Sequence, residues 1–264
     1  MSDVRNWLEM TKLNGMSLDL KNTFSIIKKL NLDFQTKKVI HVAGSNGKGT
    51  VCALMSASLT LSGISNLMFT SPHVSRIEER FRLNCKPISK EDFEYGLNEI
   101  YQLSQGGNNS DRVELTFFEV TFLVSLVCAF KSEVEVIILE TGLGGRLDAT
   151  RCVPADICLL TSITNEHTDI LGERIEDIAS EKAAIARPNI PIIVRDMNTL
   201  EFRNAVLYEA ENAGNVNLGE RKFPALPKFV EIQDNVSTRE EAQILANEVL
   251  QLIDLPNNML KKAN

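Results

Sequence analysis

The sequence has 264 residues, 44% hydrophobic and 24% charged, which is typical of one large globular domain or two small ones. Acidic residues outnumber basic ones by 35 to 28 and no run of Lys and Arg occurs, so a nucleic-acid-binding surface is not expected. The N-terminal segment carries charge and no apolar run approaches membrane-spanning length, so neither a secretory signal nor a membrane segment is predicted.

The first half of the chain alternates amphipathic segments with short apolar ones. The apolar patterns predict helices over 2–12 and 17–30, a buried strand over 37–43, a helix over 49–61, a strand over 65–70 and a helix over 115–131. Ser89, with Asp92 three residues later, is predicted to cap a further helix. A polar, Arg-rich stretch over 71–87 shows no period, and 105–111 is predicted to be a flexible loop.

The second half continues the alternation of strands and helices. Strands are predicted over 133–140, 156–163, 191–194 and 227–232, and helices over 175–187, 200–213 and 237–253. A glycine-rich loop, TGLGGRLDATRCV, follows the first of these strands. This order predicts an α/β fold with a mainly parallel P-loop-type sheet covered by helices on both faces. One domain is expected over 1–254, followed by a frayed tail over 255–264.

The five cysteines carry little sign of a disulfide framework. Their number is odd, and no C-x-x-C pair occurs among positions 52, 85, 128, 152 and 158. Reduced thiols in a cytoplasmic protein are therefore expected, rather than disulfides or a zinc site.

The stretch HVAGSNGKGT has the composition of a phosphate-binding loop, but Gly49 separates Lys48 from the hydroxyl of Thr50. Glycines let backbone N–H groups approach phosphate oxygens, and the following helix adds the partial positive charge of its N-terminus. The alternative is an ordinary strand–helix turn with a solvated lysine. The residues expected to surround the nucleotide phosphates are Gly44, Ser45, Asn46, Gly47, Lys48, Gly49 and Thr50.

Three more polar residues follow predicted strands. Ser71 comes after the strand over 65–70, Glu140 ends the next strand, and His167 follows the strand over 156–163. In an open parallel sheet, ligands bind beyond the carboxyl ends of the strands, so these residues and the phosphate loop are expected to share one edge. Hydroxyl and carboxylate oxygens suit magnesium, whereas imidazole is a less usual ligand for it. Taken alone, each residue is more often solvated or part of a helix cap.

Lys182 lies on the apolar face of the helix over 175–187, because it shares helical spacing with Ile175, Ile178 and Ile185. Burying an ammonium without a partner is costly. Two interpretations stay open: its stem packs while its head reaches the solvent, or the lysine points into a cleft, charged against phosphate or chemically modified.

Five stretches match one family in order and spacing. They are HVAGSNGKGT, TSPHVSRIEERFRLNCKPIS, LTFFE, ILETGLGGRLDAT and EKAAIARP. Over residues 15–195 the chain resembles folylpolyglutamate synthase/dihydrofolate synthase of the Mur ligase superfamily, whose phosphate loop has this G-x-x-G-K-G-[ST] spelling.

The resemblance implies a cytoplasmic ligase that joins L-glutamate to dihydropteroate or a folate, using ATP and Mg²⁺, through an acyl phosphate. Lys48, Lys182 and His167 are then the expected catalytic residues. Ser71, Glu140 and His167 match the family's magnesium ligands. Lys182 matches a lysine that the family carbamylates, and the carbamate would help to bind a second Mg²⁺.

The resemblance also implies a site for the second substrate. Phe118, Asp148 and Ala149 match positions that hold the pterin ring, by aromatic stacking and hydrogen bonding. Arg80 and Arg82 lie in the stretch that matches a mobile loop at the folate site, and are candidates for binding anionic groups. Small molecules, rather than nucleic acid or membrane, are thus the expected partners.

The sequence departs from the family in three places. Residues 164–167 read TNEH where the family has G-[LI]-D-H, and 237–242 read STREEA where it has H-Q-x-x-N-A. No segment matches the family's C-terminal domain, which a separate chain would have to supply. The alternative to a ligase is therefore a non-catalytic ATP- or pterin-binding module. A Mur-type ligase of cell-wall precursors is a third hypothesis, which the motifs of the folate branch disfavour.

Overall fold

One eight-stranded sheet runs through the protein, and its strand order is β4-β3-β2-β5-β1-β6-β7-β8. The computed structural model describes residues 3–15, 19–106, 112–213, 223–233 and 235–263. All neighbouring pairs from β2 to β8 are parallel, and only β3 and β4 run antiparallel to their neighbours. The strands are β1 (Lys38–Ala43), β2 (Asn66–Phe69), β3 (Phe81–Leu83), β4 (Lys86–Pro87), β5 (Val136–Glu140), β6 (Ile157–Leu160), β7 (Pro191–Arg195) and β8 (Leu226–Val230).

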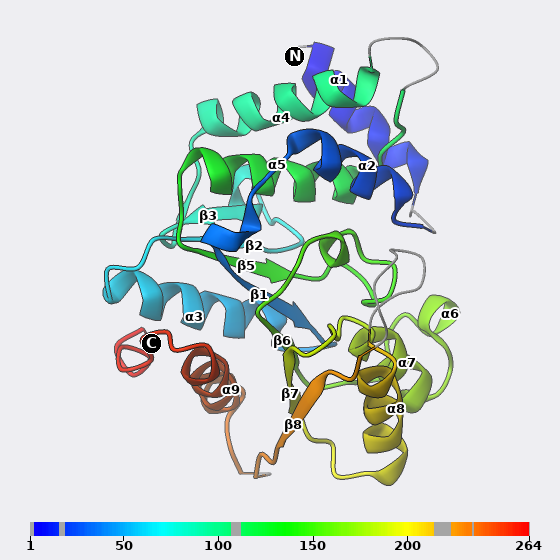
Figure 1. The fold of residues 1–264 in the computed structure, drawn as a ribbon, viewed down its shortest axis with the longest axis vertical. Coiled ribbons are helices and arrows are strands. Elements are labelled where there is room, and N and C mark those ends of the chain that lie inside the picture. Colours follow the sequence, from blue (N-terminus) through cyan, green and yellow to red (C-terminus); the bar gives the residue numbers. More distant parts are fainter. Residues whose placement is uncertain (1–2, 16–18, 107–111, 214–222, 234, 264) are drawn as a thin grey trace.

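Helices cover both faces of the sheet, as predicted (Figure 1). One face carries α3 (Lys48–Leu61) and α9 (Thr238–Leu252). The other face carries α5 (Phe117–Lys131), α7 (Ile175–Ala183) and α8 (Leu200–Glu211). A further layer packs on α5 and consists of α1 (Asp3–Met10), α2 (Lys21–Leu30) and α4 (Lys90–Gln105), while α6 (Thr168–Leu171) is a single short turn beside α7.

The side chains of β1 show how the sheet separates its cores. Ile40 and Val42 pack with α3 and α9, whereas Val39 points to the opposite face and packs under α5. His41 lies on the same face as Val39, because successive side chains of a strand alternate. It pairs with Cys158 of β6, which belongs to the core under α7 and α8. His41 is thus a buried polar residue between two apolar cores.

The stretch 71–87 is more regular than the sequence suggested. It holds a 3₁₀ turn, η3 (Ile77–Arg80), and the hairpin of β3 and β4. Phe81 is fully buried and pairs with Phe69 of β2. Strands of three and two residues are too short to show an alternating pattern, which is why the sequence of this stretch shows no period.

Helix starts agree with the predicted caps. The side chain of Ser89 accepts a hydrogen bond from the backbone of Asp92 and caps α4. Capping boxes open α5 at Thr116 and α9 at Ser237. Several predicted helices are shorter than expected: α2 begins at Lys21 rather than at 17, and α7 ends at Ala183 rather than at 187. Of the loop predicted over 105–111, residues 107–111 lie outside the described ones.

The expectation of a frayed tail was also wrong. After α9 the chain makes a series of turns that bring Leu260 back onto the core under α3, where it is buried. Leu255 and Ala263 pack against the same core. A few scattered apolar residues among polar ones give no periodic pattern, so the sequence did not reveal this contact.

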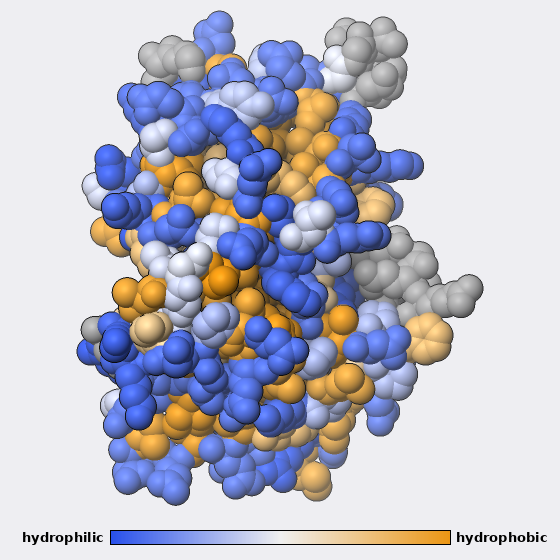
Figure 2. Space-filling view, turned by 60° about the vertical axis from the view of Figure 1, so that its left-hand side comes forward, coloured by the Kyte–Doolittle hydropathy of each residue, from blue (hydrophilic) through white to orange (hydrophobic). Residues whose placement is uncertain are grey.

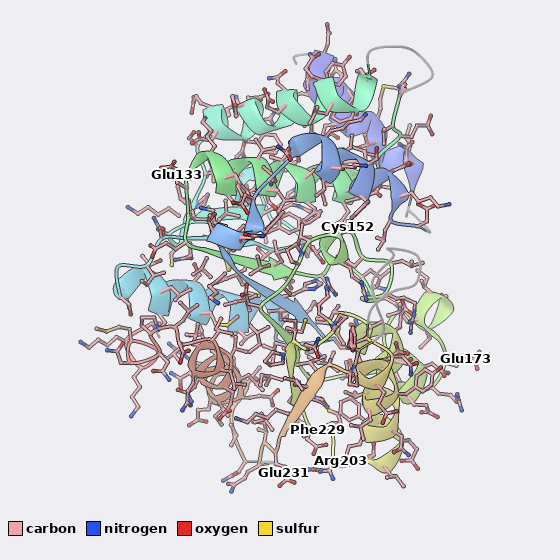
Figure 3. All side chains as sticks on the ribbon, viewed as in Figure 1. Glu133, Cys152, Glu173, Arg203, Phe229 and Glu231 are labelled. Carbon is pink, nitrogen blue, oxygen red and sulfur yellow. The ribbon has the colours of Figure 1, made fainter. Side chains whose placement is uncertain are left out.

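A cluster of charged side chains lies beside the last strand at the lower edge of the molecule, where Arg203, Phe229 and Glu231 lie together (Figure 3). Arg203 of α8 pairs with the carboxylate of Asp196, which is fully buried after β7. The same guanidinium lies 3.5 Å from Glu231 and above the ring of Phe229. This cluster fixes α8 against the ends of β7 and β8.

Hydrophilic side chains cover most of the face drawn in Figure 2, and hydrophobic ones appear in smaller groups between them. Among the described helices, none combines the length and the apolar character that crossing a membrane requires. All five cysteines are free thiols, as expected.

Candidate functional site

The strand order brings the predicted site residues to one edge of the sheet. β1 lies between β5 and β6, and β2 lies on the other side of β5, so the carboxyl ends of these four strands are adjacent. The phosphate loop follows β1, Ser71 follows β2, and Glu140 ends β5. The shared edge expected from the sequence is therefore present.

The loop between β1 and α3 is held by its glycines and by the segment after β6. Gly44 has a φ of 143° and packs so closely that a Cβ there would lie 1.9 Å from Oγ1 of Thr161. Gly47, at a φ of 84°, opens α3. The amide of Ser45 donates to the carbonyl of Ser162 at 2.8 Å. The loop therefore presents the N-terminus of a 14-residue helix in a fixed orientation.

Lys48 lies folded over this loop. Its Nζ donates to the carbonyl oxygens of Gly44 at 2.7 Å and Ser45 at 3.1 Å. The ammonium is thus already at the loop.

Glu140 lies between the phosphate loop and Ser71. Its Oε2 accepts a hydrogen bond from the backbone amide of Ser71 at 3.2 Å, and both its oxygens lie 3.8 Å from where a Cβ of Gly49 would be. Burial raises the pKa of Glu140 to about 7, against the opposing effects of the Ser71 amide and Lys48. A nearly buried carboxylate beside a helix N-terminus is a suitable place for a cation.

The third expected metal ligand is placed differently. His167 is exposed and adopts a left-handed conformation, with a φ of 50°, at the start of α6. Within the described residues, no hydrogen bond joins its side chain to Ser71 or Glu140, and no group of three or more His, Cys, Asp and Glu side chains is arranged to hold a metal ion. A hydrogen bond joins Ser71 to Glu140, and His167 as a third ligand stays a prediction.

Lys182 is buried and does not reach the solvent, so the interpretation of a solvated head was wrong. Only 1% of the residue is exposed, and its Nζ lies 2.9 Å from Oε1 of Glu166 and 3.0 Å from the carbonyl of Gly44. Burial lowers the pKa of Lys182, while the hydrogen bond and charge of Glu166 act in the opposite direction. Lys182 therefore points at the base of the phosphate loop. Glu166, one of the departures from the family, is its ion-pair partner.

A cavity of about 340 Å³ opens between the 71–80 stretch, the start of α5 and the glycine-rich loop. Phe118 lies in its wall, against Gly142, where a Cβ would lie 2.5 Å from the ring. Arg80 also lines it, with its guanidinium over the ring of Phe117. The lining residues are Gly15, Ser71, Pro72, Arg80, Thr116, Phe117, Phe118, Glu119, Gly142, Leu143, Leu147, Asp148 and Ala149. We call this cavity the acceptor pocket.

Arg82 does not belong to the acceptor pocket. It lines a second cavity of about 720 Å³, which begins at Gly49 and Thr50 on α3 and reaches Thr238 and Arg239 at the start of α9. The two arginines are separated because Arg80 ends the turn η3 before the strand begins, whereas Arg82 lies within β3.

The glycine-rich loop is anchored by two of its own side chains. Arg146 makes a bidentate pair with Glu209 of α8 and a further hydrogen bond to Glu181 of α7. Asp148 accepts hydrogen bonds from the amides of Gly142 at 2.8 Å and Leu143 at 3.1 Å. No local sequence pattern indicates this role of Arg146, because its partners lie 35 and 63 residues away along the chain.

Residues 42–244 match the family model described as the Mur ligase middle domain. The dihydrofolate synthase/folylpolyglutamate synthase of Haemophilus influenzae is 37% identical over 194 residues, covering 73% of this chain and 43% of that protein. The Bacillus subtilis protein of the same name is 33% identical over 210 residues, covering 79% and 49%. The chain thus spans about half the length of the curated relatives it matches.

Solved structures give the same result. The structure of Escherichia coli FolC in complex with DHPP and ADP superimposes with a TM-score of 0.82 at 27% identity, covering 99% of this chain and 65% of that one. A Yersinia pestis folylpolyglutamate synthase/dihydrofolate synthase complexed with AMPPNP and Mn ion gives a TM-score of 0.75 at 27% identity, covering 93% and 62%. These are the proteins that the sequence motifs resemble.

Proposed function

Because this chain belongs to the Mur ligase family through its middle domain, we propose that it is the ATP-binding part of a ligase that joins L-glutamate to dihydropteroate or a folate. In this reaction a substrate carboxylate attacks the γ-phosphorus of ATP, which gives an acyl phosphate and ADP. The amine of glutamate then attacks the acyl carbon, so an amide forms and phosphate leaves. Catalysis of this kind depends mainly on positioning and charge.

One observation supports this proposal most directly: Ser71 and Glu140 connect the phosphate loop to the acceptor pocket. Ser71 lines the acceptor pocket, and its amide donates to Glu140, whose oxygens face Gly49 of the loop. A substrate whose ring lies in the acceptor pocket would thereby have its carboxylate directed toward the phosphate loop, as phosphoryl transfer requires.

In the proposed complex the phosphate loop binds ATP. The amides from Gly47 to Thr50 face the phosphate oxygens, since those of Ser45 and Asn46 donate to the carbonyl of Ser162. Lys48 exchanges its two carbonyl partners for the β- and γ-phosphates. The cavity from Thr50 to Thr238 and Arg239 begins at the same helix and would take the rest of the nucleotide.

Glu140 fits the magnesium ion that such a reaction needs. Only its Oε2 has a hydrogen-bond partner among the described residues, so Oε1 is available to a cation. Its raised pKa has burial as the main cause, and a bound cation would favour the ionised form. We propose Glu140 and Ser71 as ligands, with His167 as a third. The ion would screen the phosphate charges during attack.

We further propose that Lys182 is carbamylated in the active enzyme, which requires its pair with Glu166 to open. Carbon-13 NMR with labelled bicarbonate tests this directly. A carbamate signal is expected in the wild type and not in Lys182→Arg. An unmodified ammonium at high bicarbonate would contradict the proposal.

The acceptor pocket would hold the pterin ring against Phe118 and the backbone of Ala149, with Arg80 near its anionic groups. Arg82 would act in the other cavity instead.

The experiment that tests the function measures binding and turnover separately. Calorimetry with ATP–Mg²⁺ and with dihydropteroate is expected to show both binding events. Product formation from dihydropteroate or tetrahydrofolate with L-glutamate is then assayed, with and without the C-terminal domain of a relative supplied as a second chain. Binding without product in either case would favour the non-catalytic module. Absence of both binding events would exclude both functions. Small molecules as partners and a cytoplasmic location belong to the same proposal.

A further inference from the structure

A chain of buried hydrogen bonds runs from the strand that carries the phosphate loop to the glycine-rich loop. Nε2 of His41 lies 2.7 Å from Oγ1 of Thr150. The same hydroxyl donates to Oδ1 of Asp148. His41, Thr150 and Asp148 are each at most 5% exposed. We call this chain the His41 relay.

The donors and acceptors of the relay are fixed by elementary counting. An ionised carboxylate only accepts, so the one proton of the Thr150 hydroxyl goes to Asp148. The ring of His41 must then donate from Nε2 to Thr150. Its Nδ1 is buried and has no hydrogen-bond partner among the described residues. This fits a neutral ring, in which Nδ1 carries no proton. The relay therefore sets one tautomer of His41.

Asp148 has no acceptor capacity left for a ligand. A carboxylate offers about four lone-pair sites. Oδ1 accepts from the amide and hydroxyl of Thr150, and Oδ2 accepts from the amides of Gly142 and Leu143. Asp148 therefore shapes the glycine-rich loop. Direct hydrogen bonding of its carboxylate to a pterin ring, which the family resemblance implies, would need one of these four bonds to break.

The relay joins the two halves of the site. The backbone that it holds, at Gly142, Leu143 and Asp148, lines the acceptor pocket. His41 stands three residues before Gly44, the first glycine of the phosphate loop. We propose that His41 and Thr150 are positioning residues, which fix the shape of the acceptor pocket relative to the phosphate loop. This rests on the proposed function of the pocket.

The test compares matched variants of the full chain. Thr150→Val keeps the shape of the side chain and removes the hydroxyl, whereas Thr150→Ser keeps the hydroxyl. His41→Leu removes the ring donor, whereas His41→Gln keeps an N–H donor.

Calorimetry is expected to show dihydropteroate binding weakened about tenfold or more in Thr150→Val and His41→Leu. In Thr150→Val the carboxylate of Asp148 loses a hydrogen-bond donor, and in His41→Leu the hydroxyl of Thr150 loses one. ATP–Mg²⁺ binding is expected to change by less than about twofold, and the Ser and Gln variants to stay within about threefold of wild type for both ligands. Unchanged dihydropteroate affinity in Thr150→Val would overturn the proposal. So would an equal loss of both ligands, which indicates a general structural role.

A second readout needs no ligand, so failure of the proposed function is distinguishable from failure of the relay. If the wild type binds no dihydropteroate, the pocket assignment fails. The relay is then judged by NMR on the free chain. Faster amide exchange at Gly142 and Leu143 in Thr150→Val, with the Nε2–H tautomer of His41 in the wild type, supports it. Unchanged exchange overturns it.

Discussion

Buried titratable side chains surround the phosphate loop, and each avoids an isolated charge in a different way. His41 stays neutral and donates to Thr150. Lys182 is paired with Glu166. Glu140 has its pKa raised to about 7, mainly by burial. Because unpaired charge is costly away from water, these groups respond to any change in a partner or a ligand.

His41 makes stability depend on pH. Burial, and then the charges of Arg187 and Arg151, hold its pKa well below the ordinary value, whereas the unfolded chain titrates near pH ~6.5. The unfolded chain therefore binds a proton that the folded one does not, and this contribution to stability is lost as the pH falls below about 6.5. Between pH 7.5 and 5.5, wild type is expected to lose about 1.4 kcal/mol more of its unfolding free energy than His41→Gln. Urea unfolding at the two pH values checks this, and parallel losses would contradict it.

Glu166→Gln tests the ion pair of Lys182. The substitution removes the charged partner of a buried ammonium, which keeps its hydrogen bond to the Gly44 carbonyl, and is expected to cost about 1.5–3 kcal/mol of unfolding free energy. The matched control is Glu173→Gln, because Glu173 is exposed on the same segment (Figure 3) and should change stability by less than about 0.5 kcal/mol. Equal stability of the two variants would show that the pair contributes nothing.

At the scale of elements, two segments without periodic patterns gain their order from packing. The hairpin of β3 and β4 extends the sheet beyond β2, through the buried ring of Phe81. The turns after α9 return to the sheet, where Leu260 joins the core under α3. Both segments also border a cavity of the site, since Arg82 and Ala263 line the same one as Thr50.

Leu260→Ala is expected to destabilise the protein by about 2–3 kcal/mol, because it removes a buried side chain from a packed core. Lys261→Ala, next to it and exposed, is expected to change stability by less than about 0.5 kcal/mol. Chemical denaturation of both variants measures the difference. A frayed tail would instead leave Leu260→Ala as stable as wild type.

At the scale of the whole molecule, the sheet carries both halves of the site on one rigid platform. The loop after β1 and the residues after β2 and β5 are adjacent because these strands are neighbours. A ligand bound at this edge therefore stabilises the entire fold, and not only a loop.

ATP–Mg²⁺ at a hundred times its dissociation constant is expected to raise the unfolding free energy by about 2.7 kcal/mol. Lys48→Ala is expected to lose this stabilisation while unfolding much like wild type without ligand, because the hydrogen bonds of the Lys48 ammonium go to carbonyls of the loop itself. Lys28→Ala, an exposed lysine of α2, is the control that should retain the full effect. If Lys48→Ala is stabilised as much as wild type, the loop is not the nucleotide site.

Much of the secondary structure, and the place of several site residues, could be predicted from local sequence patterns. Apolar periodicity located the parallel strands and the main helices, and Ser89 marked where α4 begins. The glycines predicted the loop between β1 and α3, and Ser71 and Glu140 were expected at its side. The place of these residues could be predicted because it depends on the backbone requirements of a few consecutive residues, together with the rule that parallel strands end at one edge. Phosphate binding by this loop stays a prediction.

What the sequence by itself determined is therefore the class of fold and the place of the glycine-rich loop between β1 and α3. Only the tertiary structure decided the partners of buried polar groups: Glu166 for Lys182, Thr150 for His41, and the separation of Arg80 from Arg82. The reason is physical. A hydrogen bond or ion pair in the interior joins residues whose separation along the chain carries no signal, and its strength depends on the exclusion of water, which only the packed molecule provides.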